Sequence, residues 1–149
     1  MKLPYTRTSD AITGYTDSKI ARIENRDCVV RAVASASGMT YDKAHGWVAD
    51  KFKRVNKKGT RGFPIGMNAM ETNGEKLNRK SVKTLPKENL MNGKSQMSVG
   101  TFVKMYDKGT YIIRVTGHAF TIKDGVVIGN TEDAIKIRRV VKSAWKIGR

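Results

Sequence analysis

The chain has 149 residues and carries 29 Lys and Arg against 13 Asp and Glu, a formal net charge of +16. This length predicts one domain, residues 1–149, which is large enough to bury a hydrophobic core without disulfides or metal ions to stabilise it. The single cysteine excludes an internal disulfide and a multi-cysteine zinc site, and it favours a reducing compartment. No apolar run is long enough to cross a membrane and no apolar signal core follows the N-terminus. We therefore expect a cytoplasmic protein without membrane contact.

The excess of positive charge favours encounter with polyanions or with acidic protein surfaces. The basic residues are scattered along the chain rather than gathered in one arm or helix. Their densest run, over residues 51–61, is adequately explained by a solvated helix end and loop. Nucleic acid and acidic proteins are therefore candidate partners, on the evidence of net charge alone.

Residues 1–15 are polar and predict an extended arm or an edge strand. After a short turn, we expect a helix that begins at Cys28 and ends at Gly38, a residue suited to a left-handed C-cap. Either Asn25 or Asp27 can cap its N-terminus. Small and apolar residues cover nearly every face of this segment, which is typical of a helix buried in a core.

A second helix, from residue 41 to about 53, places its apolar residues three and four positions apart after a Thr40 cap. A basic loop over 54–61 separates it from a weaker third helix, 63 to about 71. The remaining elements expected in this half are a short strand within 77–85, a polar loop over 87–96 and a short helix after Ser98.

The composition changes at Thr110, after which β-branched residues predict strands. Residues 111–115 and 119–122 are two such runs. Asp124-Gly125 is a strong hairpin signal and is followed by a third strand. The tail from 134 to 145 alternates in part and predicts one or two further strands.

Helices followed by strands are the order of an α+β fold. We expect a helical half over about residues 16–106 and a sheet half over about 110–147 within the one domain. The buried cysteine helix of the first half is expected to pack on the antiparallel sheet of the second.

Cys28 stands where a polar segment becomes a buried helix, and there the positive end of the helix dipole stabilises a thiolate. A lone cysteine is equally well explained as a small core residue. His118 follows Gly117 at the start of a predicted strand. An imidazole in that place can face a thiol at a helix tip and take its proton, or it can be a core or rim histidine.

The hairpin that follows His118 places it opposite about residue 131. Asn130 is therefore within reach and can orient the imidazole by accepting a hydrogen bond from its far nitrogen. Asp133 is the alternative third residue. An asparagine that caps the next segment explains Asn130 equally well. The three side chains of a Cys28–His118–Asn130 triad are the catalytic candidates.

This order of residues, with Asp-Cys-Val-Val-Arg-Ala opening a helix and Gly-His-Ala-Phe-Thr-Ile-x-Asp-Gly-Val-Val-x-x-Asn after it, resembles the papain-like cysteine peptidase superfamily. The likeness covers about residues 22–53 and 110–131. It is nearest to small bacteriophage-encoded members and more distant to bacteriocin-leader-processing peptidase domains. It implies a papain-like fold and a thiol protease, with Cys28 as nucleophile, His118 as general base and then acid, and Asn130 as orienting group. The compartment of a phage-encoded member would be the host cytoplasm.

Papain-like enzymes usually place a glutamine about six residues before the cysteine, where it donates to the oxyanion. Arg22 occupies this position, and no glutamine precedes Cys28. Arg22 or Asn25 can supply the donor, together with the backbone N–H of Cys28. Because loss of one such donor lowers the rate by about 10²–10³ in measured proteases, this is the most consequential departure from the family pattern.

Two functions follow from these observations. The first is a hydrolase, a cysteine peptidase or related acyl-transfer enzyme acting on a protein or peptide, for which the charge favours an acidic substrate. The second is a non-enzymatic basic protein that binds nucleic acid or an acidic host protein. One cysteine and two distant histidines do not make a metal-ligand set, and we expect neither metal nor cofactor. His45, on the second helix, is expected in a surface or packing role.

Overall fold

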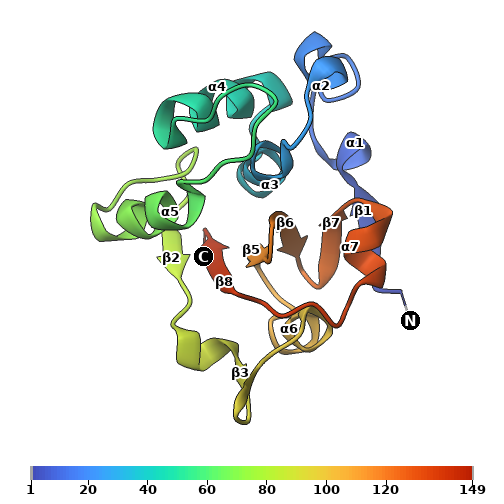
Figure 1. Ribbon diagram of the computed structural model, residues 1–149, viewed down its shortest axis with the longest axis vertical. Coiled ribbons are helices and arrows are strands. Elements are labelled where there is room, and N and C mark those ends of the chain that lie inside the picture. The colour runs from blue at the N-terminus through green and yellow to red at the C-terminus, as the bar shows by residue number, and fades with distance from the viewer. Residues whose placement is uncertain (1, 149) are drawn as a thin grey trace.

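A six-stranded, mostly antiparallel sheet separates two groups of helices in the computed structural model, which describes residues 2–148 (Figure 1). The sheet order is β1-β7-β6-β5-β8-β2. Only β1 and β7 pair in parallel; the other pairs are antiparallel. The strands are β1 (Tyr5–Arg7), β2 (Val82–Thr84), β5 (Thr110–Val115), β6 (His118–Lys123), β7 (Val126–Gly129) and β8 (Ser143–Ile147), with β3 (Met91–Asn92) and β4 (Ser95–Gln96) in a separate hairpin.

The helices lie on both faces of the sheet, with α3 between α4 and the strands, and α6 on the opposite side (Figure 1). None of the helices within residues 2–148 is long and apolar enough to cross a membrane. They are α1 (Thr8–Ala11), α2 (Lys19–Ile23), α3 (Cys28–Ser37), α4 (Tyr41–Phe52), α5 (Phe63–Thr72), α6 (Val99–Met105) and α7 (Thr131–Ile135), with a 3-10 helix η1 (Lys87–Leu90). The α+β class predicted from the sequence is confirmed.

Alternation along the central strand β5 divides the core in two. Ile112 packs in a cluster with α3, α4 and α5, whereas Ile113 packs in a second cluster with α6. Successive side chains of a strand point to opposite faces of the sheet. A strand in a sheet that is covered on both faces therefore has a continuous run of apolar residues. This explains why residues 111–115 are almost entirely apolar.

Local signals in the sequence set the ends of the helices as predicted. Gly38 closes α3 in the left-handed conformation, with φ of 83°, and its N–H donates to the Ala34 carbonyl. The Thr40 side chain caps α4, and the Ser98 side chain caps α6. These groups satisfy helix-end donors and acceptors that otherwise have no partner within the helix.

The β6–β7 hairpin is formed as the Asp124-Gly125 signal predicts. Both turn residues have positive φ, 49° and 77°, which is the requirement of a type I′ turn. Lys123 pairs with Val126, and Thr121 pairs with Ile128. Extending this register places residue 118 opposite residue 131, in agreement with the sequence prediction.

The cysteine helix is anchored directly on this hairpin. Its valines Val30 and Val33 are fully buried. The Thr121 hydroxyl on β6 donates to the Ala32 carbonyl at 2.9 Å, and the Ser35 hydroxyl donates to Thr121 at 2.9 Å. These contacts across the helix–sheet interface hold the first residue of α3 close to the first residue of β6.

The two edge strands of the sheet come from outside the predicted sheet half. The segment 1–15 contributes β1 and the short helix α1, and β2 also joins the sheet from within the helical half; residue 1 lies outside the described residues. Both edge strands are only three residues long. The edge strand that was one of two predictions for 1–15 and the short strand predicted within 77–85 are thus both present. Their neighbours in the sheet depend on long-range pairing, which local periodicity does not reveal.

Two further segments differ from the predictions. Residues 87–96, expected as loop, form η1 and the β3–β4 hairpin. The tail has one strand, β8, which agrees with the prediction of one or two strands, but its first residues, 134 and 135, belong to the helix α7. Asn130 and Asp133 form a capping box, in which each side chain accepts a hydrogen bond from the other's backbone N–H, and this initiates the helix.

Candidate active site

Cys28 is the first residue of α3, and its side chain is partly exposed. The N–H groups of a first helical turn have no partner within the helix and create a positive end. The preceding Asp27 does not cap this turn with its side chain. Its carboxylate instead accepts from the Tyr41 hydroxyl at 2.7 Å and pairs with Arg31 at 3.2 Å. The negative charge adjacent to the thiol is therefore already compensated.

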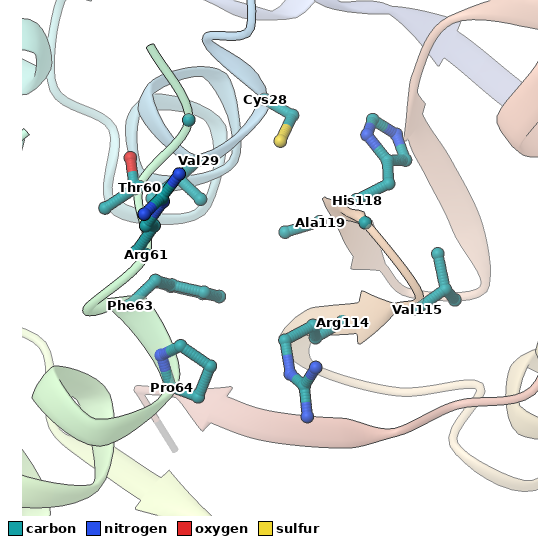
Figure 2. Close-up of a pocket in the computed structure, with 12 residues that line it drawn as sticks. Cys28, Val29, Thr60, Arg61, Phe63, Pro64, Arg114, Val115, His118 and Ala119 are labelled. Carbon is teal, nitrogen blue, oxygen red and sulfur yellow. The ribbon is translucent and has the colours of Figure 1, made fainter.

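His118 begins β6, and Figure 2 shows its ring facing the Cys28 side chain across the mouth of a cavity. Its Nε2–H donates to Oδ1 of Asp133 at 2.8 Å. Because Nε2 is engaged in this way, Nδ1 is the ring nitrogen that remains for the thiol. A base that is oriented through one nitrogen and takes a proton with the other is the arrangement that thiol activation requires.

The electrostatics of the site favour a thiolate–imidazolium pair. Burial opposes ionisation of Cys28, but the hydrogen bonds from the His118 side chain and the Ala119 backbone lower the thiol pKa below its ordinary value. Burial likewise opposes protonation of His118, but the hydrogen bonds with Asp133 and Cys28 raise the imidazole pKa to about 9. Each group therefore stabilises the charged form of the other.

Asp133 is only 2% exposed and is fully engaged. Oδ1 accepts from His118 and from Nη2 of Arg139 at 3.1 Å, and Oδ2 accepts from the Asn130 backbone N–H at 3.0 Å. Burial opposes its ionisation, but the hydrogen bond and charge of His118 lower the pKa of the carboxyl. A Cβ added at Gly129 would lie 2.3 Å from Oδ2, so this approach requires glycine there.

Asn130 does not occupy the place predicted for it. Its side-chain oxygen accepts from the Asp133 backbone N–H at 3.0 Å and caps α7. The alternative third residue, Asp133, contacts the imidazole instead. The physical reason is the helix that begins at residue 131, because one helical turn returns the side chain of Asp133 toward the end of the hairpin.

The two side chains predicted as oxyanion donors do not lie at the site. Arg22 is exposed on α2, and Asn25 is exposed in the following loop. The Asn25 carbonyl accepts from Nη2 of Arg54 at 3.2 Å, which holds this loop against α4 rather than against the sheet. Neither residue lines the cavity beside the thiol. The N–H groups at the start of α3 are the remaining donors from the predicted set.

A cavity of about 270 Å³ opens beside Cys28. Three segments far apart in the sequence form it: the start of α3, the loop and first turn of α5, and the β5–β6 hairpin (Figure 2). The sequence reasoning missed its polar lining residues, Thr60, Arg61 and Arg114. The available signals were the basic loop 54–61 and the one charged residue in the apolar run 111–115.

His45 belongs to a separate buried cluster. Its Nε2 lies 2.6 Å from Oε2 of Glu24, which also accepts from Nη1 of Arg54 at 3.0 Å. Burial opposes ionisation of Glu24, but its hydrogen bonds with Arg54 and His45 lower the carboxyl pKa to about 2. The cluster joins α2 to α4 and to the loop after α4. Among residues 2–148, no three His, Cys, Asp or Glu side chains are grouped to hold a metal ion.

Comparisons of the chain with known protein families, curated proteins and solved structures find no match. What can be inferred about function therefore rests on the chemistry of Cys28, His118 and Asp133 and on the cavity beside them. The α+β fold positions these groups, with the thiol at the start of helix α3 and the imidazole at the start of strand β6.

Proposed function

We propose that the protein is a cysteine hydrolase of papain-like type that cleaves an amide bond in a protein or peptide. One observation carries this proposal: a thiol at the start of a buried helix meets an imidazole whose other nitrogen is held by a buried carboxylate. Cys28 is the nucleophile, His118 the general base and acid, and Asp133 the orienting group.

In the first half-reaction, the Cys28 sulfur forms a bond to the carbonyl carbon, and the carbonyl π electrons move onto oxygen. N–H groups at the start of α3 donate to this oxyanion. When the carbonyl re-forms, the carbon–nitrogen bond breaks and the amine leaves with the proton from Nδ1 of His118. The product is a thioester on Cys28.

In the second half-reaction, neutral His118 takes a proton from water, and the resulting hydroxide oxygen bonds to the thioester carbon. Collapse of this intermediate breaks the carbon–sulfur bond, which releases a carboxylic acid and restores the thiolate–imidazolium pair. An amine in place of water would give acyl transfer by the same steps.

A carboxylate in the orienting position distinguishes this site from the family pattern of an asparagine. Asp133 brings a full negative charge to the imidazolium, and Arg139 keeps that carboxylate ionised. The ion pair is therefore expected to persist to higher pH than an amide partner would allow. The bacteriophage origin, the host cytoplasm and the alternative of nucleic-acid or acidic-protein binding stay predictions, the last resting on the net charge of +16 alone.

The test is the rate at which iodoacetamide alkylates Cys28 at pH 6, where an ordinary thiol is almost entirely protonated. Because the chain has one cysteine, the rate reports this site alone. We expect His118→Ala to lower it by roughly 10- to 100-fold, since the thiolate loses its counter-ion. His45→Ala removes the other histidine and should leave it unchanged. Alkylation of the wild type at the rate of free cysteine would contradict the proposal.

A further inference from the structure

The cavity beside Cys28 is lined by two arginines and by no acidic side chain. Arg114 is partly buried on β5, and Arg61 is exposed in the loop before α5. Among residues 2–148, no carboxylate lies within ion-pair distance of either guanidinium. Both positive charges are therefore available to whatever occupies the cavity.

Arg114 keeps unused hydrogen-bond donors in a place where such donors are normally satisfied. Its Nη2 donates to the Ser143 hydroxyl at 3.2 Å, and its Nε is buried without a partner among the described residues. The Thr60 hydroxyl, which lines the same cavity, is also buried without one. Buried polar atoms nearly always make hydrogen bonds, so two unpaired ones among the residues that line a single cavity indicate a missing ligand.

The shape and lining of the cavity favour a carboxylate as that ligand. Figure 2 shows Arg114 across the cavity from the Cys28 sulfur, with Phe63 and Pro64 along one wall. Apolar walls lower the local dielectric and strengthen an ion pair formed between them. The planar guanidinium presents donors in a fork that matches the two oxygens of a carboxylate.

We infer that the cavity selects peptides that carry a carboxylate near the bond that Cys28 attacks, with Arg114 as its main partner and Arg61 as a second cation at the rim. The inference rests on the proposed function, since it assumes that peptides reach Cys28. The carboxylate can belong to an Asp or Glu side chain or to the C-terminus of the peptide. Both present the same group to the guanidinium.

The test uses peptides with an N-terminal chloroacetyl group, which alkylates the single cysteine without any need for turnover. Chloroacetyl peptide amides containing Glu are compared with their Gln isosteres, with zero, one or two glycines between the reactive group and the Glu. This spacing series is needed because Arg114 lies across the cavity from the sulfur. Chloroacetyl-Gly-Gly-Ala as the free acid is compared with its amide, to test the C-terminal carboxylate.

At the best spacing, we expect the acidic peptide to react about tenfold faster than its isostere, the effect of one charge-assisted hydrogen-bonded pair. Arg114→Gln should bring this ratio close to one. Arg114→Lys, which keeps the charge but not the fork, should give an intermediate ratio, and Arg61→Gln a smaller loss. Lys94→Gln removes the same charge from an exposed turn and should leave the ratio unchanged.

A ratio near one at every spacing and for the free-acid pair would overturn the inference, as would a preference that survives both Arg114→Gln and Arg61→Gln. Chloroacetamide, measured on every variant, reports whether the thiol site is intact and normalises each ratio. Slow, free-thiol-like reaction of the wild type with chloroacetamide at pH 6 would contradict the proposed function instead. The two failures are therefore distinguishable.

Discussion

Residues 2–148 contain two clusters that each combine a histidine, a largely buried carboxylate and an arginine. In one, His118 bonds to Asp133 at 2.8 Å, and Arg139 holds the carboxylate at 3.1 Å. In the other, His45 bonds to Glu24 at 2.6 Å, and Arg54 holds the carboxylate at 3.0 Å. The corresponding distances in the two clusters are similar, and in the second cluster Nη1 of Arg54 also lies 3.4 Å from Nε2 of His45.

The clusters differ in what surrounds the histidine. The His118 side chain is 21% exposed, lies beside a thiol and borders the cavity of about 270 Å³. The His45 side chain is 10% exposed, and the residues lining the small cavity beside it include no thiol and no hydroxyl side chain. A histidine–carboxylate pair is therefore structural or catalytic according to whether its second nitrogen meets a reactive group. The following changes separate the two roles.

The largest effect is expected from Glu24→Gln. It leaves the completely buried Arg54 side chain without its counter-ion, and loss of one partner of a buried pair costs about 3 kcal/mol or more. Urea denaturation should show this loss in the free energy of unfolding. The rate of Cys28 alkylation at pH 6 should be unchanged in the folded variant; a slower rate would mean that the cluster also supports the thiol site.

The two clusters should lose their contributions to the free energy of unfolding at opposite ends of the pH range. The pKa of Glu24 is lowered to about 2 from an ordinary 4.5, so its contribution is complete above pH 4.5 and is lost as the pH falls toward 2. The pKa of His118 is raised to about 9 from 6.5, so its contribution is complete below pH 6.5 and is lost as the pH rises through 9.

The difference in unfolding free energy between the wild type and Glu24→Gln, or between the wild type and His118→Gln, is expected to contain a pH-dependent part of about 2 kcal/mol. Urea denaturation at a series of pH values measures both. The Glu24→Gln difference should shrink only toward acid, and the His118→Gln difference only toward alkali. The same pH dependence for both variants would contradict the separate assignments.

Asp133→Asn should affect the chemistry more than the fold. The amide can still accept from His118, but it no longer supplies a charge to the imidazolium, so the His118 pKa should fall from about 9 toward 6.5. We expect alkylation of Cys28 at pH 6 to slow by about tenfold. Titration of the imidazole by NMR measures the pKa directly, and an unchanged midpoint would show that Asp133 does not set it.

The smallest effects are expected from replacing glycines with alanine. Gly129→Ala places a Cβ against the Asp133 carboxylate and should displace it, slowing alkylation by a few-fold and lowering stability by about 1–2 kcal/mol. Gly46, in α4 near His45, has open space around its Cβ position. Gly46→Ala should therefore stabilise the protein by about 0.5–1 kcal/mol. Thermal unfolding and alkylation rates distinguish the two.

Several parts of the fold could be predicted because a few neighbouring residues decide them. Gly38 and Thr40 mark the end of one helix and the start of the next, and Asp124-Gly125 specifies a hairpin and its register. The places of Cys28 and His118 followed from the same kind of evidence. Each lies at a boundary where composition and turn chemistry change within a few positions.

The candidate site was predicted less completely, because two of its features depend on rotation and on long-range pairing. The choice between Asn130 and Asp133 turned on whether the chain after β7 stays extended or begins a helix, since that rotation exchanges the side chain that reaches His118. The candidate Arg22 was drawn from a spacing typical of the family, and here it lies on α2. Asn25 lies in the loop after α2, and its carbonyl accepts a hydrogen bond from Arg54, just after α4.

The sequence alone determined the α+β class, the helix that presents the thiol, and the hairpin that begins at the imidazole, because these depend on local propensity and turn geometry. Only the tertiary structure decided that Asp133 orients the ring and that Arg114 faces the thiol across a cavity. It also decided that both edge strands of the sheet come from outside the predicted sheet half of the chain. Those features join residues many positions apart, and their energy comes from contacts that no short window of sequence contains.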